Sequence, residues 1–589
     1  MRLRELTIKN FRKIEDLTVT FPKGLCVIVG ENNTGKTAIV DALRLMLFSG
    51  RDYDALRLDE EDFRTGTDFA PIELSCTFCD QNDEDEVHFQ ECLVDIGGGK
   101  FEIRLNARVE FNKTTRNPKV KMWGGETEGG HVGSIYEHLA AVYLQPLRDP
   151  ESGLRPSRHS QVSRLLDSLT DEDQYDEFVT IAKDANTKIR ELDPVKSARD
   201  DLNTQMSSIA GDQLAQKTEL IFADPTFHRI IAGLQPEIEN LPFSLNGLGY
   251  NNLIFTSATL ATLKRSPHFS FRSIVIEEPE AHLHPQLQVL LLQYFSKVAA
   301  VESGEVQVIA SSHSPILASQ APIDSIVSLQ EYEGKVSAIS VCSIDMDAEM
   351  KKKLQRYLDS TRAELFFARR ILMVEGISEA LLLPVLVKIA CGDLKQSAVT
   401  LINADGLNFN CFLPLFGETK IAVPIAILTD GDAPSVGGPL SATATQLKAQ
   451  EGTIQNLRVE CCARTFEHEL ARSSELLPLM LQAFKILRPV VGANLESNIQ
   501  SLTSDDQKAD AFLSEFLNSR ASKGLFAQEL ATLLENESLQ PTVVPDYIRK
   551  ALQFLSVLNS PTNDESTGNS SRTNPSPAAN QATEGCDIC

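Results

Sequence analysis

The sequence predicts an α/β protein in which buried strands deliver polar residues at their carboxyl ends in two separate parts of the chain. In the first part, the apolar run 25–29 leads into the loop GENNTGKT at 30–37, and an amphipathic segment follows. In the second part, the apolar runs 371–374 and 424–428 each end in acidic residues. Ligands of α/β sheets bind at the carboxyl ends of such strands. We therefore expect two sites with different chemistry.

The loop at 30–37 has the residues and the strand–loop–helix context of a P-loop. Its glycines let the backbone turn tightly enough for consecutive N–H groups to point at a phosphate. The lysine would reach the β- and γ-phosphates, the threonine would hold Mg²⁺, and the start of the helix adds a favourable dipole. A turn that binds nothing is the alternative. The residues expected at the nucleotide are Gly30, Asn32, Asn33, Gly35, Lys36 and Thr37, with Arg12 from the turn before the P-loop strand.

Composition limits the classes of function. At 589 residues the chain is too long for one core, so several domains are expected. A formal net charge of −25 argues against a generally basic nucleic-acid binder, although a local basic groove stays open. No apolar run approaches the roughly 20 residues of a membrane span, and the first residues lack a secretory signal. We therefore expect a cytoplasmic protein that does not associate with membranes.

The scattered cysteines are expected to be reduced thiols. Cys76 and Cys79, with His88 and Cys92, leave a zinc site as an alternative.

Alternating apolar and polar residues predict several strands in the first 111 residues. A helical insertion is expected next, at 156–240, and it should be compact because no heptad repeat is sustained long enough for an extended coiled coil. A dimer contact is one role that it could have. The stretch 244–252 then opens a helix with small residues, which suits a phosphate as well as an ordinary loop. The predicted strands are 4–9, 16–21, 72–78, 87–94 and 101–111.

Two later strands end in residues that suit phosphate chemistry. The β-branched run 274–278 delivers Glu277 and Glu278, of which one can hold Mg²⁺ through water and the other can orient an attacking water. The strand 306–310 precedes His313, which can contact a γ-phosphate. A surface acidic turn and a structural histidine are the alternatives, and both are disfavoured by the P-loop in the same chain.

Together these residues resemble the ABC-type ATPase heads of the RecF/SMC group. In this resemblance 30–37 is the Walker A motif, 274–278 the Walker B motif and 244–252 a degenerate signature. Glu277 departs from the Asp that is more usual there, and the long SMC coiled coil is missing. The resemblance implies that the signature of one protomer caps the ATP of another, so the active form is at least a dimer. It adds Gln145, Ser244, Gly247 and Gly249 to the nucleotide-binding residues and gives His313 the role of the switch histidine.

The second half carries an acidic constellation. Glu375 ends the strand 371–374, and Glu379 lies four residues later in a helical turn, on the same side. Asp430 and Asp432 follow the strand 424–428 and aim two hard oxygen donors in one direction, as Mg²⁺ or Mn²⁺ requires. Such a cluster supports one- or two-metal chemistry at phosphodiesters. The alternative is a set of aspartates that cap helices.

This half resembles the Toprim fold, and an ATPase head followed by a Toprim domain resembles the OLD (overcoming lysogenization defect) nuclease family over almost all of residues 1–555. The resemblance implies that Glu467 joins the metal ligands and that Lys523 assists at the scissile phosphate. It implies a homodimeric or larger metal-dependent DNA endonuclease in phage defence or DNA processing. Its ligands would be ATP, Mg²⁺ or Mn²⁺, with Ca²⁺ able to bind, and double-stranded DNA. The catalytic residues would be Glu375, Asp430, Asp432 and Lys523, with Glu278 at the ATPase site.

The set is most similar to class 2 members and to the GajA subunit of Gabija antiphage systems, which work beside a UvrD-like helicase. The alternatives are an ATP-driven sensor or scaffold that cuts nothing, and a RecF-like repair ATPase. We expect the ATPase head to occupy 1–155 and 241–345, around the insertion 156–240. A Toprim domain with helical additions would occupy 346–557, followed by a disordered tail at 558–589.

Overall fold

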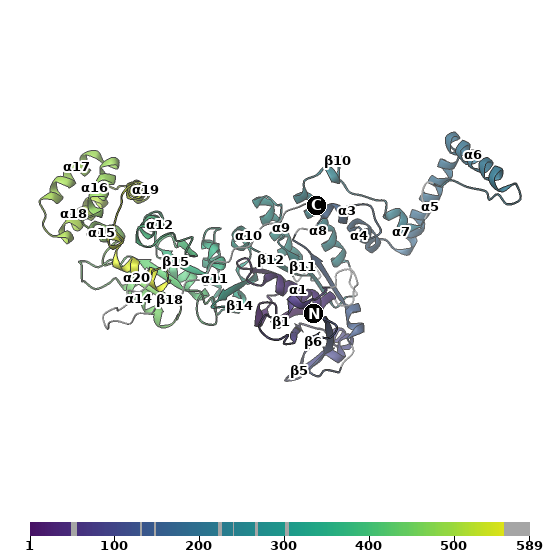
Figure 1. The fold of residues 1–589 in the computed structure, drawn as a ribbon, viewed down its shortest axis with the longest axis horizontal. Coiled ribbons are helices and arrows are strands. Elements are labelled where there is room, and N and C mark those ends of the chain that lie inside the picture. The colour runs from purple at the N-terminus through teal and green to yellow at the C-terminus, as the bar shows by residue number, and fades with distance from the viewer. Residues whose placement is uncertain are drawn as a thin grey trace, which may run out of the picture.

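The structure is a computed structural model, which describes most of the chain and shows an extended molecule with sheets in two places (Figure 1). No helix in this part of the chain is both long and apolar enough to cross a membrane. The predicted tail lies outside the described residues except for its first position. The described residues are 1–48, 56–129, 132–146, 149–221, 226–238, 241–265, 269–300 and 306–558.

Two sheets build the first half. One is antiparallel, with the strand order β2-β1-β4-β6-β5 and β7 paired to β6. The other has the order β14-β13-β3-β12-β11-β8 and is parallel except for the β13–β14 pair. The antiparallel strands are β1 (Arg2–Phe11), β2 (Ile14–Thr20), β4 (Ile72–Cys79), β5 (Leu93–Gly97), β6 (Lys100–Asn112) and β7 (Asn117–Gly124). The others are β3 (Leu25–Val29), β8 (Leu139–Leu144), β11 (Phe271–Glu277), β12 (Gln307–Ser312), β13 (Ile326–Tyr332) and β14 (Lys335–Ser340).

Helix α1 (Lys36–Phe48) joins these two sheets through one apolar core. Its buried residues share a cluster with Leu6 of β1 and Ile28 of β3. The P-loop helix is therefore held on both sides by buried apolar surface, which is the dominant favourable term in folding.

The predicted strand at 87–94 is wrong for all but its last two residues. Residues Asp83–His88 form helix α2, and β5 begins only at Leu93. Asn82 and Asp85 make a reciprocal capping box, and acidic residues fill the first turn, where they favour the helix dipole. Val87 is 73% exposed, so its apolar character did not indicate a buried strand position.

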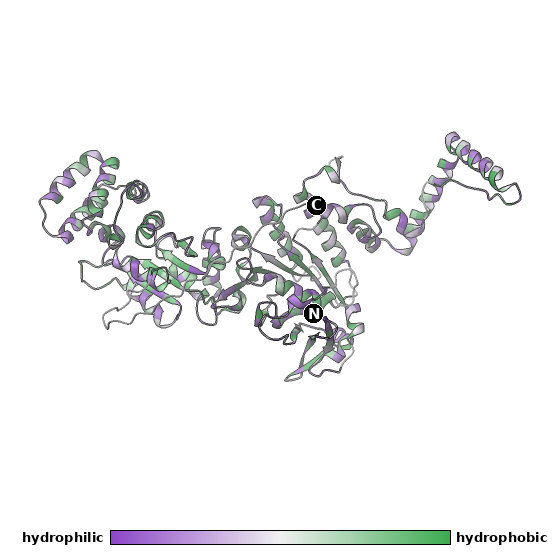
Figure 2. Cartoon of the chain, viewed as in Figure 1, coloured by the Kyte–Doolittle hydropathy of each residue, from purple (hydrophilic) through white to green (hydrophobic). Residues whose placement is uncertain are grey.

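The insertion is helical, as predicted, but it is extended instead of compact. Figure 1 shows α5 (Glu172–Arg190) and α6 (Asp193–Ala210) projecting away from both sheets, and α6 has no buried residue. In Figure 2 apolar residues are interspersed with polar ones along this arm. The arm thus leaves apolar side chains in solvent: Ile181, Leu192, Leu202, Met206 and Ile209. Shorter helices lie at its base, namely α3 (Pro150–Leu154), α4 (Gln161–Leu169) and α7 (Phe227–Ile231).

A four-stranded parallel sheet forms the second half, in the order β16-β15-β17-β18. Its strands are β15 (Arg370–Val374), β16 (Val399–Asn403), β17 (Ile425–Thr429) and β18 (Leu457–Cys461). Helices then pack into one further core with α12 (Ile377–Ala390). They are α15 (Phe466–Ala471), α16 (Leu476–Leu487), α17 (Pro489–Gln500), α18 (Asp505–Asn518), α19 (Lys523–Glu535) and α20 (Asp546–Phe554).

The two halves share an apolar core. A single cluster of buried side chains runs from Val27 of β3 and Ile274 of β11 to Ile371 of β15 and Ile425 of β17. Phe366, in the short helix η8 (Arg362–Phe367) that leads into β15, is part of it. The junction between the halves is therefore packed, since interiors of this kind are dense and transmit strain.

Candidate functional site

A cavity of about 300 Å³ lies over the P-loop. Gly30 is required because a Cβ there would lie 2.4 Å from the Leu329 carbonyl oxygen, and Gly35 has φ +104°. Lys36 Nζ donates to the carbonyl oxygens of Gly30 (2.7 Å) and Glu31 (2.8 Å), and burial lowers the pKa of Lys36. The cavity brings together seven of the fourteen residues predicted at the nucleotide. Its lining is Arg12, Lys13, Asn32, Asn33, Gly35, Lys36, Thr37, Ala38 and Glu278.

Arg12 lines this cavity, but carboxylates hold its guanidinium. Nε contacts Asp62 Oδ1 at 2.8 Å, and Nη1 contacts Asp41 Oδ2 at 2.8 Å. Burial alone would lower the pKa of Arg12, but Asp62 and Asp41 outweigh it and raise the pKa. A direct contact between Arg12 and a nucleotide stays a prediction, and it would compete with these two ion pairs.

The Walker B carboxylates lie at the carboxyl end of β11, next to the end of the parallel strand β12. Glu277 ends β11, where the Tyr143 hydroxyl donates to its Oε2 at 2.8 Å, and burial raises the pKa of Glu277. Glu278 has φ 44°, which is an unusual conformation for a residue with a side chain. Its Oε1 lies 3.2 Å from His313 Nδ1, just beyond β12. The structure thus brings Glu278 and His313 together beside the P-loop cavity.

Two residues that the sequence did not single out contact these groups: Glu280 contacts His313, and Tyr143 contacts Glu277. Glu280 is buried and accepts from the Ser312 hydroxyl (2.6 Å) and the His313 N–H (3.3 Å), and burial raises its pKa. Tyr143 lies under the Arg44 guanidinium, 4.2 Å from its ring centroid. A further carboxylate two residues after Glu278 was a usable signal for Glu280. Nothing local marked Tyr143, because β11 and β8 pair only in the folded sheet.

The signature residues lie apart from this cavity. Ser244, Gly247 and Gly249 surround the start of α8 (Leu248–Lys264) and are not among the residues that line it. Gly249 approaches the His282 carbonyl, which a Cβ would meet at 2.6 Å. Gln145 follows β8 directly and is exposed. Their roles at a nucleotide stay predictions.

We expect Tyr143→Phe to weaken Mg²⁺-dependent nucleotide binding by about 10-fold or more, because outer-shell partners of metal ligands have effects of this size. The substitution removes only the hydroxyl that orients Glu277. Binding of a fluorescent ATP analogue should therefore change with Mg²⁺ present and stay near wild type in EDTA. An equal loss in both conditions would contradict this role.

Carboxylates meet at the carboxyl ends of β15 and β17. Glu375 Oε2 accepts from the Thr429 hydroxyl (3.0 Å) and the Asp430 N–H (3.3 Å). Asp430 Oδ1 accepts from the Phe466 N–H at 2.8 Å. Burial, together with the charges of Glu375, Glu379 and Glu467, raises the pKa of Asp430 to about 8. The pKa of Glu379 is raised to about 7, mainly by burial.

The predicted Glu467 and Lys523 join this cluster. Lys523, the first residue of α19, lies 3.1 Å from Glu467 Oε1, and Ser378 Oγ lies 3.2 Å from the same oxygen. Burial would lower the pKa of Lys523, but the charges of Glu467 and Asp430 outweigh it and raise the pKa. His468 is buried next to Glu467, and its Nε2 lies 3.0 Å from Asp510 Oδ1. The ammonium group of Lys523 therefore balances part of the negative charge of the carboxylate cluster.

This donor set consists of hard carboxylate oxygens, which suit Mg²⁺ or Mn²⁺. Across the described ranges, no three His, Cys, Asp or Glu side chains already converge as ligands of one ion. Asp432 is exposed, has φ 48° and donates its N–H to the Arg464 carbonyl, so its place among the ligands stays a prediction.

The raised pKa values predict that stability in EDTA falls as pH rises. Asp430 titrates at 3.8 when unperturbed and at about 8 here, so its contribution is complete below about pH 4 and lost through about pH 8. Because one pKa unit corresponds to about 1.4 kcal/mol, we expect an effect of the order of 2 kcal/mol after relaxation of the cluster. Urea unfolding at about pH 5 and pH 8.5 measures it. Asp430→Asn should flatten this dependence, and an unchanged slope would contradict the assignment.

Comparison with known proteins identifies both halves. Residues 1–128 and 134–318 match the AAA ATPase domain family, and residues 366–432 match the overcoming lysogenization defect protein-like TOPRIM domain. Endonuclease GajA of Bacillus cereus (strain VD045) is 23% identical over 458 residues, which cover 74% of this chain and 76% of the relative. OLD nuclease of Thermus scotoductus is 26% identical over 398 residues, which cover 64% of this chain and 72% of the relative. DNA replication and repair protein RecF of Geobacillus thermodenitrificans is 24% identical over 184 residues, which cover 29% of this chain and 50% of the relative.

These matches confirm the predicted fold class, an ABC-type ATPase head followed by a Toprim domain. Domains of these two kinds imply binding of a nucleotide and a divalent metal. The chain belongs to the AAA ATPase domain family, carries an OLD-like Toprim domain behind the ATPase and is homologous to the GajA and OLD nucleases.

Proposed function

We propose that this protein is an ATP-binding, divalent-metal-dependent DNA endonuclease of OLD type, acting in phage defence or DNA processing. One observation carries the proposal: the carboxylates of Glu375, Glu379, Asp430 and Glu467 form a cluster at the carboxyl ends of β15 and β17, in a chain that also has a P-loop cavity. Two of its relatives, which align with 74% and 64% of the chain, are named nucleases.

The Toprim cluster supplies the groups that phosphodiester cleavage needs. A bound Mg²⁺ or Mn²⁺ polarises the phosphodiester and lowers the pKa of an attacking water. Glu375, Asp430 and Glu467 would hold the ion, with Glu379 and Asp432 as further ligands. The Lys523 ammonium, now paired with Glu467, would neutralise charge that develops on the scissile phosphate. Since Lys523 has an exposed side chain (49%), it can reach a bound backbone.

The ATP site would use Lys36 for the phosphates, Thr37 and Glu277 for Mg²⁺, Glu278 for the water and His313 for the γ-phosphate. The signature around Ser244 lies apart from the P-loop cavity of its own chain, which supports a homodimer or larger assembly in which another protomer completes the site. The apolar residues exposed on α6 support the helical arm as a contact in that assembly. A UvrD-like helicase partner remains part of the proposal by resemblance to GajA.

Cleavage of supercoiled plasmid tests the proposal. Nicked or linear DNA should form with Mg²⁺ or Mn²⁺ and should not form in EDTA. The same reactions with and without ATP then show whether the nucleotide activates or inhibits cleavage. Intact plasmid under every metal condition, with ATP still bound, would instead favour a non-nucleolytic ATP-driven sensor. A RecF-like role is less well supported, because the RecF relative aligns with only 29% of this chain.

A further inference from the structure

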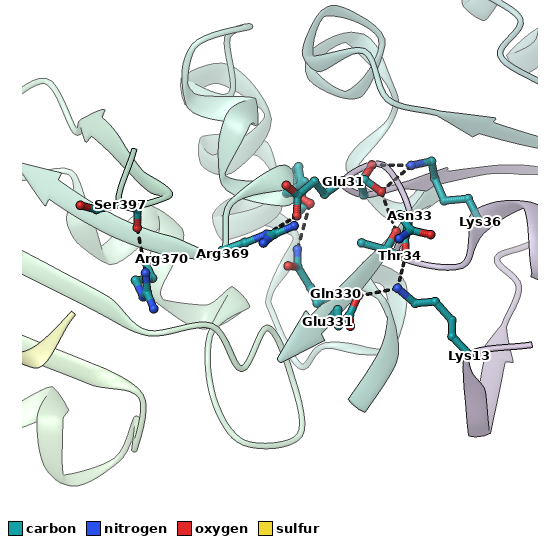
Figure 3. A network of polar contacts seen from close by, with 12 residues as sticks. Lys13, Glu31, Asn33, Thr34, Lys36, Gln330, Glu331, Arg369, Arg370 and Ser397 are labelled. Carbon is teal, nitrogen blue, oxygen red and sulfur yellow. Dashed lines mark hydrogen bonds and ion pairs between the residues drawn. The ribbon is translucent and has the colours of Figure 1, made fainter. Parts of the chain in front are cut away.

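The Toprim domain begins directly beside the P-loop. Arg369, the residue before β15, places its Nε 2.6 Å from Oε2 of Glu31, the second residue of the P-loop. Figure 3 shows this ion pair between the two halves, whose partners are 338 residues apart in sequence. A cavity of about 680 Å³ adjoins it, lined by Glu31 and Arg369 and by Val399 and Thr400 of β16. Arg369 is therefore a polar link across a junction that is open at this point.

Glu31 is at the centre of the P-loop contacts. Its carbonyl oxygen accepts from Lys36 Nζ at 2.8 Å and from the Thr34 hydroxyl at 2.8 Å (Figure 3). Its carboxylate is one of the negative charges that act on Lys36. A P-loop lysine binds phosphates through this same Nζ, so Glu31 competes for the lysine through its carbonyl and repels phosphates through its carboxylate. Whatever holds and neutralises the Glu31 side chain thus affects how phosphates bind.

The Toprim side of the link is anchored. Gln330 Nε2 donates to the Phe366 carbonyl at 2.9 Å, and Phe366 belongs to the shared core. Phe366 lies three residues before Arg369 in the sequence. Next to Gln330 in sequence, Glu331 pairs with Lys13, and Lys13 also contacts the carbonyl oxygen of Asn33 in the P-loop (Figure 3). From Arg370 the buried strand β15 runs straight to Glu375. Arg369 therefore connects Glu31 to the start of the strand that leads to a predicted metal ligand.

Folding stability does not explain this pair. The Arg369 and Glu31 side chains are 62% and 39% exposed, and ion pairs so exposed to solvent contribute little to folding. The same pair can matter for ligand binding, because a fivefold change in affinity requires only a small difference in interaction with the phosphates.

We propose that Arg369 is a positioning residue for the nucleotide site: it acts through Glu31 to keep the P-loop receptive to phosphate, so that the Toprim domain and the nucleotide affect each other. This inference rests on the proposed function for its second part only. By reciprocity, if a bound nucleotide changes the affinity of the Toprim site for its ligand, that ligand changes the affinity for the nucleotide by the same factor.

Binding of a fluorescent ATP analogue to the full chain tests the first part without any DNA. Arg369→Gln should weaken binding by about fivefold, because it leaves the Glu31 carboxylate unpaired beside the phosphates. Glu31→Gln should not weaken binding, and in that background Arg369→Gln should have no further effect, since contacting residues are not additive. Arg370→Gln is the matched control, because Arg370 contacts the Ser397 carbonyl at 2.8 Å and not Glu31 (Figure 3). This variant should bind ATP as wild type does.

The inference would be overturned if Arg369→Gln lowered the affinity for the ATP analogue by less than twofold. It would also be overturned if Arg369→Gln lowered this affinity equally when Glu31 is already replaced by Gln. The second readout is the ratio of plasmid cleavage rates with and without ATP, which should move towards one in Arg369→Gln and keep its wild-type value in Arg370→Gln. If wild type cuts no DNA, the proposed function fails while the binding data still decide the role of Arg369. If wild type cuts DNA and the ratio is unchanged in Arg369→Gln, only the coupling fails.

Discussion

Asp430→Asn is expected to reduce metal-dependent plasmid cleavage by about 100-fold or more. Outer-shell partners of metal sites already change affinity or activity by about 10- to 100-fold, so a direct ligand should have an effect at least that large. A hundredfold loss corresponds to about 2.7 kcal/mol of transition-state stabilisation. The substitution keeps the shape of the side chain and the oxygen that accepts from the Phe466 N–H, while it removes the negative charge.

Asp405→Asn is the matched control for this experiment. Asp405 follows β16, the strand next to β15, but its side chain is 75% exposed and pairs only loosely with Arg362 at 3.8 Å. The Asp405→Asn variant should cleave plasmid as wild type does. Calorimetric titration with Mn²⁺ should show weaker binding to Asp430→Asn and unchanged binding to Asp405→Asn. Full cleavage by Asp430→Asn would place the nuclease site elsewhere in the chain.

Lys36→Ala should weaken ATP binding by about 30-fold or more. Removing one partner of a buried charge pair costs at least about 2 kcal/mol, and the bound phosphates would lose their closest positive charge. Lys36 lines the cavity, and its Nζ donates to two P-loop carbonyls, whereas Lys13, which lines the same cavity, is paired with Glu331. Binding of the fluorescent ATP analogue measures the loss directly.

Lys23→Ala makes the same change at the opposite end of β3. Lys23 precedes the strand, is 54% exposed and lies 3.6 Å from Asp80, away from the P-loop cavity. Its ATP affinity should match wild type. If Lys36→Ala also bound ATP normally, the P-loop assignment would be wrong. If it lost ATP binding and its cleavage no longer responded to ATP, the two sites would be coupled as proposed.

The parts of both sites that lie close together in sequence could be predicted from the sequence. The P-loop is eight consecutive residues after a buried strand, and Gly35 is required locally because its φ is +104°, whereas Gly30 is required by the distant Leu329 carbonyl. Glu375 directly follows β15, Glu379 lies in the first turn of α12, and Asp430 directly follows an apolar strand. In such cases strand and helix periodicity already places the side chains. The strand predicted at 87–94 was wrong where a capping box between Asn82 and Asp85 favoured a helix.

The resemblance to OLD nucleases supplied Glu467 and Lys523, which spacing alone did not select. The structure places them 3.1 Å apart although 56 residues separate them, because α15 and α19 pack in the same core as α12. The hydroxyl of Tyr143 on Glu277 and the buried carboxylate of Glu280 under His313 likewise depend on strand pairing.

By itself, the sequence determined the fold class, the P-loop, the strand-end carboxylates and the order of the two domains. Each of these follows from residues that interact within one strand, turn or helix. Only the tertiary structure decided which carboxylates face one another, that Asp432 points to solvent, that the helical arm is extended, and that Arg369 reaches Glu31. The physical reason is that these contacts join distant segments, and packing of the apolar cores, which no local pattern encodes, sets their distances.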